Sequence, residues 1–128
     1  MNIISLLEQI DVKRSVERFV AQTKDKYGID RLYMHVRDYE NTIVLDDIVI
    51  PKDKRKQGIG SSIMNEIINF ADGMGKIVML TPAIKSDYHG TTSRGRLVKF
   101  YKRFGFVPNK GRNKDFTLPA DSMYRTPK

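Results

Sequence analysis

The chain has 128 residues, of which 40% are hydrophobic and 30% are charged, and these proportions suit one globular domain with its own core. It contains no cysteine, which excludes disulfides, thiolate metal sites and cysteine nucleophiles. Its formal net charge of +8 favours an anionic partner, and the cations fall into several short groups instead of one basic arm.

The first part of the chain is predicted to be helical. Apolar side chains recur at helical spacing from Val12 to Tyr27, and Gly28 closes this amphipathic pattern. Residues 3–10 are predicted to form a separate, shorter helix. No apolar run approaches the roughly 18 residues that a membrane span needs, and the start lacks the features of a signal peptide. We therefore expect no membrane contact and a cytoplasmic protein.

Two strands follow the helical region. Residues 31–37 alternate between apolar and polar side chains, which is typical of a half-buried strand. Residues 42–50 are apolar on both faces, apart from two adjacent aspartates. The short polar link between the two segments predicts an antiparallel hairpin.

The two aspartates, Asp46 and Asp47, are placed by the period-two alternation of the second strand. It puts Asp46 on the face of Val44 and Ile48, and it puts Asp47 on the opposite face with Leu45. An unpaired buried carboxylate is costly, so each needs a partner or a wet cleft. Partial burial would also raise the pKa of a carboxyl group toward that of a useful base.

A strand–helix–strand crossover comes next. Apolar residues recur every three or four positions from Ile59, and this helix is predicted to end near Gly73 or Gly75. Residues 76–83 read as a short buried strand, which the crossover makes parallel to the strand before the helix.

The last third of the chain continues the alternation of helices and strands. Residues 84–93 form a polar loop, and residues 94–104 are predicted to be helical, with Gly105 ending the helix in a left-handed conformation. A strand starts at Phe106 and a last one lies within 116–125. The order of elements predicts an α/β fold, a mixed sheet with helices packed against it.

The segment PKDKRKQGIGSS, residues 51–62, links a predicted strand to a predicted helix. It lacks the GxxxxGK(S/T) pattern, and GxGxxG fails because Ile63 stands where a glycine is required. The first turn of a helix nevertheless offers unpaired N–H groups and partial positive charge to an anion. Local features alone leave two alternatives, an anion cradle or a solvated basic turn.

Three motifs together resemble the GNAT family of N-acetyltransferases. Arg55 to Gly60, RKQGIG, matches the family signature (Q/R)-x-x-G-x-(G/A) between a strand and a helix. LDDIVIPKDK before it is similar to the strand that carries substrate-side residues, and KFYKRFGF, residues 99–106, is similar to the FYxxxGF segment. The resemblance covers about residues 30–125. It identifies the chain as a short member with a reduced N-terminal half, and Arg94 stands where many members have Asn.

The resemblance implies a single N-acetyltransferase domain over 1–128, with a helical part at 1–29 and a sheet core with the acetyl-CoA site at 30–125. It implies direct transfer of an acetyl group from acetyl-CoA to a primary amine. In this assignment the backbone N–H of Val49 or Ile50 contacts the thioester carbonyl. The residues assigned to the pyrophosphate of CoA are Arg55, Lys56, Gln57, Gly58, Ile59, Gly60 and Ser61.

Two residues receive catalytic roles from the resemblance, and each role has a structural alternative. Tyr101 would donate a proton to the thiolate of CoA, or it would be a core residue of its helix. Asp46 would be the general base, or one of the two aspartates would pair with a cation such as Arg31 or Arg37.

The remaining charged residues carry weaker assignments. The cations Lys99, Lys102 and Arg103 would contact the 3′-phosphate of CoA or form a solvated helix face. Lys52 and Lys54 are interpreted as serving solubility only. His89, in the polar loop, is a residue that would titrate near neutral pH, and two histidines without ligand spacing predict no metal site.

The rival function is a non-catalytic GNAT-fold module that binds CoA, nucleic acid or a partner protein. The segment NKGRNK, residues 109–114, would serve nucleic acid or an acidic acceptor, but it lacks interleaved aromatic residues. An exposed edge on a shortened sheet would also favour a homodimer. Short members of the family occur in bacteriophage, which would place the protein in a host cytoplasm.

Overall fold

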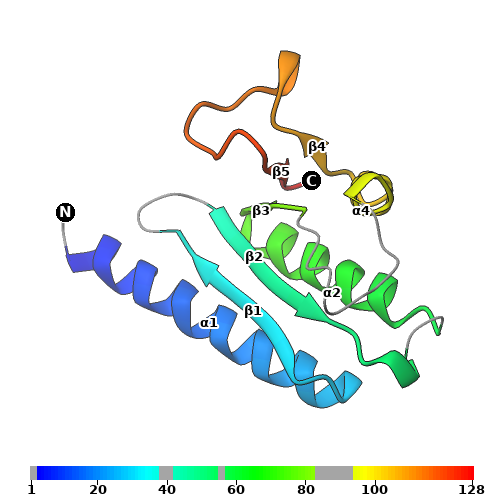
Figure 1. The fold of residues 1–128 in the computed structure, drawn as a ribbon. Helices are drawn as coiled ribbons and strands as arrows, with labels where there is room; N and C mark the ends of the chain where they lie inside the picture. Colours follow the sequence, from blue (N-terminus) through cyan, green and yellow to red (C-terminus); the bar gives the residue numbers. More distant parts are fainter. Residues whose placement is uncertain (1–2, 38–41, 55–56, 83–93) are drawn as a thin grey trace.

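The computed structural model describes residues 3–37, 42–54, 57–82 and 94–128, which form helices packed against one mixed sheet (Figure 1). The elements follow the predicted order, and the mixed α/β fold is confirmed. They are α1 (Ile3–Tyr27), β1 (Arg31–Val36), β2 (Thr42–Val49), α2 (Ile59–Met74), β3 (Ile77–Leu80), α4 (Arg94–Lys102), β4 (Val107–Pro108) and β5 (Met123–Arg125).

Helix α1 is one continuous helix of 25 residues, so the prediction of a separate short helix at 3–10 is wrong. No glycine or proline lies between Ile3 and Tyr27 to interrupt it. The helix ends at the predicted place, where Gly28 has a φ of 62°. None of the helices in the described ranges is long and apolar enough to cross a membrane.

The sheet has the strand order β1-β2-β3-β5-β4. Strands β1 and β2 form the predicted antiparallel hairpin, and β2 and β3 are parallel, as the crossover through α2 requires. Strand β5 pairs antiparallel with both β3 and β4. In Figure 1, α1 runs along β1 at one edge of the sheet, and β4, β5 and α4 lie together at the other.

The main core combines the inward side chains of the sheet with side chains of α1, α2 and α4. The rings of Phe19 in α1 and Phe70 in α2 stack with their centroids 4.4 Å apart. The buried members of this cluster are Val16, Ile29, Leu32, Ile43, Leu45, Ile63, Met64, Ile67, Ile68, Ala71, Val78, Leu80, Phe106 and Met123. Residues of α4 contribute partly buried side chains to it, and we expect burial of this apolar surface to dominate stability.

A smaller cluster lies on the opposite face of the sheet. Val44 of β2 and Met79 of β3 are buried there beneath Leu118, with Tyr124 of β5 beside them. Their neighbours in sequence on the same strands belong to the main core, as alternation in a strand requires. The chain between β4 and β5 therefore covers part of the face that the helices leave open.

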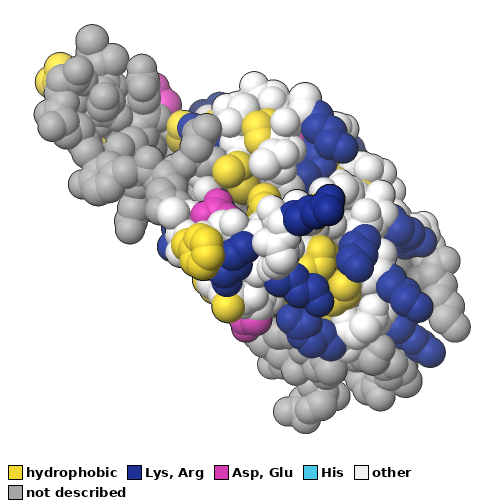
Figure 2. Space-filling view, turned by 90° about the horizontal axis from the view of Figure 1, so that it is seen from above, with side chains coloured by type: hydrophobic (Ala, Val, Ile, Leu, Met, Phe, Trp, Pro, Cys, Tyr) yellow, Lys and Arg dark blue, Asp and Glu magenta, His cyan; other side chains and the backbone are white. Residues whose placement is uncertain are grey.

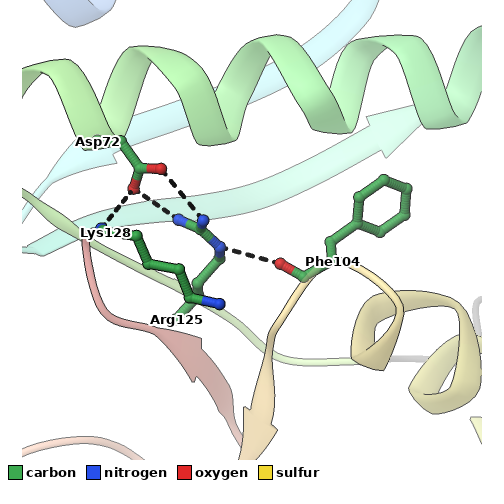
Figure 3. Close-up of polar contacts among 4 residues, drawn as sticks. All are labelled: Asp72, Phe104, Arg125 and Lys128. Atoms are coloured by element: carbon green, nitrogen blue, oxygen red, sulfur yellow. Dashed lines mark hydrogen bonds and ion pairs between the residues drawn. The ribbon is translucent and has the colours of Figure 1, made fainter.

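A buried ion pair joins α2 to β5 (Figure 3). The Arg125 guanidinium donates to both carboxylate oxygens of Asp72, at 2.6 and 3.1 Å, and its Nε donates to the carbonyl oxygen of Phe104 at 2.9 Å. The Arg125 side chain is only 8% exposed. The hydrogen bond from Arg125 lowers the pKa of Asp72 against the opposing effect of burial, and the backbone N–H of Lys128 lowers it further.

Helix α4 ends at Lys102, two residues before the predicted end. Gly105 follows in the expected left-handed region, with a φ of 90°, and the chain turns into β4. The side chains of Val98, Phe100, Tyr101 and Phe104 pack against the main core. This short turn fixes the position of Tyr101 relative to the sheet.

Candidate active site

The glycine turn before α2 is where the sequence predicts an anion site. Gly58 is the N-cap residue of α2, with a φ of 73°, and its carbonyl accepts the first helical hydrogen bond from the Ser62 N–H at 3.0 Å. A Cβ built at Gly58 would have no atom within 4 Å. The first turn of α2 contains no acidic residue. No carboxylate within this turn neutralises the partial positive charge of the helix terminus.

The predicted pyrophosphate residues fall on both sides of this turn. Arg55 and Lys56 lie outside the described residues. Gln57 is exposed, and its side-chain amide donates to the Asp53 carbonyl oxygen at 3.1 Å, so it is held against the preceding turn. Ile59, Gly60 and Ser61 form the first turn of α2 and are partly exposed. A Cβ at Gly60 would lie 4.0 Å from the ring of Phe100, so α4 packs close to the start of α2.

Lys54 has a structural contact that the sequence did not predict. Its Nζ donates to the carbonyl oxygens of Tyr27 and Gly28, at 3.1 and 2.8 Å. These carbonyls end α1, where a cation is favourable. The interpretation of Lys54 as a residue for solubility only is therefore wrong: it attaches the connection between β2 and α2 to the end of α1.

The predicted alternation of Asp46 and Asp47 is also wrong, because β2 contains a bulge. Asp47 lies opposite Tyr33 and Leu45 lies opposite Met34, which leaves Asp46 as an extra residue. After the bulge, Ile48 contacts the main core, the side on which Leu45 also lies. Both carboxylates therefore contact residues of β1 on the face of the sheet opposite the main core.

The two carboxylates have different partners on β1. Asp47 pairs with Arg31 at 2.5 Å, which is the structural alternative expected from the sequence, and its side chain is 16% exposed. Asp46 is 45% exposed and contacts Nδ1 of His35, also at 2.5 Å. Asp46 thus has a partner and is open to solvent. Sequence reasoning missed His35, because its contact with Asp46 depends on the strand register at the bulge, where His35 lies opposite Val44.

Tyr101 belongs to α4, and its side chain packs against the main core. Its ring meets the rings of Phe100 and Phe106 edge-on, with centroids 5.4 and 6.0 Å away. Burial raises the pKa of the Tyr101 hydroxyl, and the negative charge of Asp47 raises it further. The hydroxyl therefore stays protonated at neutral pH and lies within electrostatic reach of β2.

The end of β2 extends beyond its parallel partner. Pairing with β3 ends at Leu45 and Leu80, whereas β2 continues to Val49. Val49 pairs with Arg31 of β1, and Ile50 follows the end of the strand. The two residues predicted to contact a thioester carbonyl thus lie on the segment between the bulge and the glycine turn.

The other predicted site residues lie on α4, directly after it, or outside the described residues. Lys99 and Lys102 are exposed on α4, and Arg103, also exposed, follows it with its guanidinium carbon 5.3 Å from the Phe100 ring centroid. His89 lies outside the described residues. No group of three or more acidic or histidine side chains with the proximity of metal ligands is found within the described ranges.

Comparison with known proteins gives one match at the level of families. The model of the acetyltransferase (GNAT) domain matches residues 15–108, which is most of the chain and includes the glycine turn, the bulge and Tyr101. No curated protein shows significant sequence similarity to the chain.

Two solved structures are similar at low identity. Ard1 from Thermoplasma volcanium is 18% identical, with a TM-score of 0.49, over 79% of this chain and 66% of Ard1. A mutant of the toxin AtaT, bound to the C-terminus of the antitoxin AtaR and to acetyl-CoA, is 14% identical, with a TM-score of 0.46, over 75% of this chain and 54% of AtaT. The chain thus spans less than two thirds of the length of either protein.

Proposed function

Because the chain belongs to the GNAT acetyltransferase family, we propose that it moves the acetyl group of acetyl-CoA directly to a primary amine. The observation that carries this proposal is the glycine turn at the start of α2. Its left-handed Gly58, the open space where a Cβ would stand and the absence of acidic residues in the first helical turn all fit a pyrophosphate.

Acetyl-CoA would supply an activated acetyl thioester at this site, and the chain supplies the groups that bind it. The backbone N–H groups of Gly58 to Ser61 would hold the pyrophosphate. The segment of β2 that extends beyond β3 would place the Val49 or Ile50 N–H beside the thioester carbonyl, where a hydrogen-bond donor stabilises developing negative charge. Tyr101 would donate its proton to the sulfur, because its raised pKa keeps that proton available.

The proton of the attacking amine would be removed by His35, with Asp46 as its positioning partner. The contact between Asp46 and Nδ1 of His35 favours the tautomer with hydrogen on Nδ1, which leaves Nε2 as an acceptor. The bulge directs Asp46 toward His35, and this is the reason to prefer the pair over Asp46 alone. Asp47 would instead neutralise Arg31 and help to keep Tyr101 protonated.

The test is binding of acetyl-CoA by thermal unfolding, combined with release of free thiol in the presence of a panel of amines. Saturating acetyl-CoA should stabilise the protein by about 2.7 kcal/mol at 100 times Kd. Gly58→Glu should abolish this stabilisation, because it places a side chain and a negative charge in the cradle. Binding without thiol release on any amine would favour the non-catalytic module.

Two control variants separate loss of binding from strain and from added charge. Gly58→Asn keeps a residue that tolerates positive φ and adds no charge, so it should retain part of the stabilisation. Gly73→Glu adds the same charge at the far end of α2, at an exposed position with no atom within 4 Å of a new Cβ. It should bind like the wild type. Retained binding by Gly58→Glu would contradict the assignment of the cradle.

A further inference from the structure

The net positive charge of the chain is carried by its C-terminal residues, 94–128. Residues 94–128 contain ten of the 23 Lys and Arg residues but only two of the 15 Asp and Glu residues, a balance of +8 that equals the net charge of the chain. The 93 residues before them hold thirteen of each sign. Figure 2 looks onto the side of β4, β5 and α4, where Lys and Arg side chains gather and acidic side chains are sparse.

Part of this charge is carried by a loop with a fixed shape, the basic loop, residues 109–119. Asn109 is 1% exposed, and its side-chain amide donates to the carbonyl oxygens of Asp115, Leu118 and Pro119 at 2.9 to 3.2 Å. Its Oδ1 accepts from the Asp115 N–H at 2.6 Å. A buried amide with all these bonds holds both ends of the loop together, so its surface is preorganised.

The basic loop is also attached to the sheet at its middle and near its end. Leu118 is buried against Val44 and Met79, and the Tyr124 hydroxyl donates to the Asn113 carbonyl oxygen at 2.5 Å. The side chains of Lys110 and Arg112 are exposed on this framework. The loop thus presents cations at fixed positions, whereas cations on a mobile tail would lose conformational entropy on binding.

Phe116 stands at the tip of the basic loop with its side chain in water. It is 88% exposed, and the Lys114 Nζ lies 5.6 Å from the centroid of its ring. Among the described residues, the other large hydrophobic side chains that are exposed are Ile3, Ile10 and Tyr33, all on α1 and β1. The structure therefore holds one aromatic ring of the basic loop out to solvent, beside a lysine of the same loop.

We propose that the basic loop binds single-stranded nucleic acid, with Phe116 stacking on an unpaired base and Lys110, Arg112 and Lys114 contacting phosphates. An aromatic platform within a cationic surface is the arrangement that binds single strands with little sequence preference. A duplex would leave the ring unused, because its bases are already stacked. An anionic membrane would be expected to engage several apolar side chains, and this part of the described chain exposes one.

The test uses fluorescence anisotropy of labelled oligouridine and oligothymidine of about 12 nucleotides, a length within the site sizes of single-strand binders. Both should bind, and a preference for one would identify RNA or DNA as the source. Phe116→Ala should weaken binding about 5- to 100-fold, and Phe116→Trp should retain it. Neutralising the loop cations as Lys110→Gln, Arg112→Gln and Lys114→Gln should reduce the slope of log K against log salt by about 2.

The matched control neutralises three exposed cations of α1, as Lys13→Gln, Arg14→Gln and Arg18→Gln. It removes the same charge from a different surface and should leave the affinity for oligonucleotides nearly unchanged. An equal loss in both triple variants would overturn the proposal, because it would show attraction to net charge alone. Wild-type affinity for oligonucleotides in Phe116→Ala would also overturn the proposal. Binding to anionic vesicles or polyglutamate in place of oligonucleotides would overturn it as well.

A competition experiment separates this site from the proposed acetyl-CoA site. Saturating acetyl-CoA should leave oligonucleotide binding unchanged, and the basic-loop triple variant should keep its full thermal stabilisation by acetyl-CoA. Displacement of the oligonucleotide by acetyl-CoA would overturn a separate nucleic-acid site while leaving the proposed transferase function intact. Failure of acetyl-CoA to bind would contradict that function and leave the basic loop untouched.

Discussion

At the scale of single residues, the proposed chemistry depends on pairs of groups with unequal environments. Tyr101 is partly buried and keeps its proton, whereas His35 and Asp46 are exposed at 53% and 45% and would be accessible to an incoming amine. This division suits a proton donor on one side of the site and a proton acceptor on the other. Each of the two roles can be tested by one conservative substitution.

Tyr101→Phe should lower kcat by about 10²- to 10⁴-fold and leave acetyl-CoA binding nearly unchanged. The change removes only the hydroxyl, so the ring contacts with Phe100 and Phe106 remain. Tyr124→Phe is the matched control, because the Tyr124 hydroxyl serves the basic loop. An unchanged kcat on an identified amine would show that Tyr101 is a core residue only.

His35→Gln should lower kcat/KM strongly, because it removes the imidazole nitrogen that would accept the proton of the amine. Asp46→Asn should have a smaller effect on kcat/KM, since it leaves the ring in place and removes only its positioning partner. The variant that loses more kcat/KM shows which of the two residues, His35 or Asp46, is the base. A large loss in Asp46→Asn with little change in His35→Gln would make Asp46 itself the base.

At the scale of elements, the position of the site depends on connections between segments that are distant in sequence. Lys54 attaches the connection that follows β2 to the end of α1, and Arg125 attaches β5 to the last turns of α2. The second contact also reaches the Phe104 carbonyl, three residues after Tyr101. Loss of the ion pair should therefore lower the free energy of unfolding. It should also loosen the position of α4, which Phe104 follows.

Asp72→Asn should lower the free energy of unfolding by about 3 kcal/mol, because it leaves the buried Arg125 guanidinium without its counter-charge. Chemical denaturation at pH 7 measures this, and Asp11→Asn on the exposed face of α1 should change it by less than about 0.5 kcal/mol. A loss of similar size in both variants would contradict the structural role of the pair.

The ion pair of Asp72 and Arg125 also predicts how the difference in the free energy of unfolding between the wild type and Asp72→Asn depends on pH. The folded-state pKa of Asp72 lies below its ordinary value, so its contribution is fully present above the unfolded pKa of about 3.9. The contribution is lost as the pH falls through the folded-state pKa. The difference in the free energy of unfolding between the wild type and Asp72→Asn should therefore become smaller below about pH 4. A difference that stays constant would show that it does not come from the charge of Asp72.

At the scale of the whole molecule, the fold was predictable where one sequence pattern extends over many residues. The helical spacing from Ile59 to Met74 and the motif ending in Gly105 predicted elements that the structure confirms. The bulge at Asp46 was not predictable, because residues 42–50 are apolar on both faces and any register satisfies their pattern. The pair of Asp72 and Arg125 joins residues 53 positions apart, and only the folded topology brings them together.

The segregation of charge also makes the molecule a strong electric dipole. A nearly neutral body of 93 residues carries a terminal segment with the full charge of +8, so a polyanion exerts a torque as well as an attraction. The protein would approach such a partner with β4, β5 and α4 foremost and with α1 trailing. Orientation would then precede contact, and the helix-covered side would remain turned toward the solvent during the encounter.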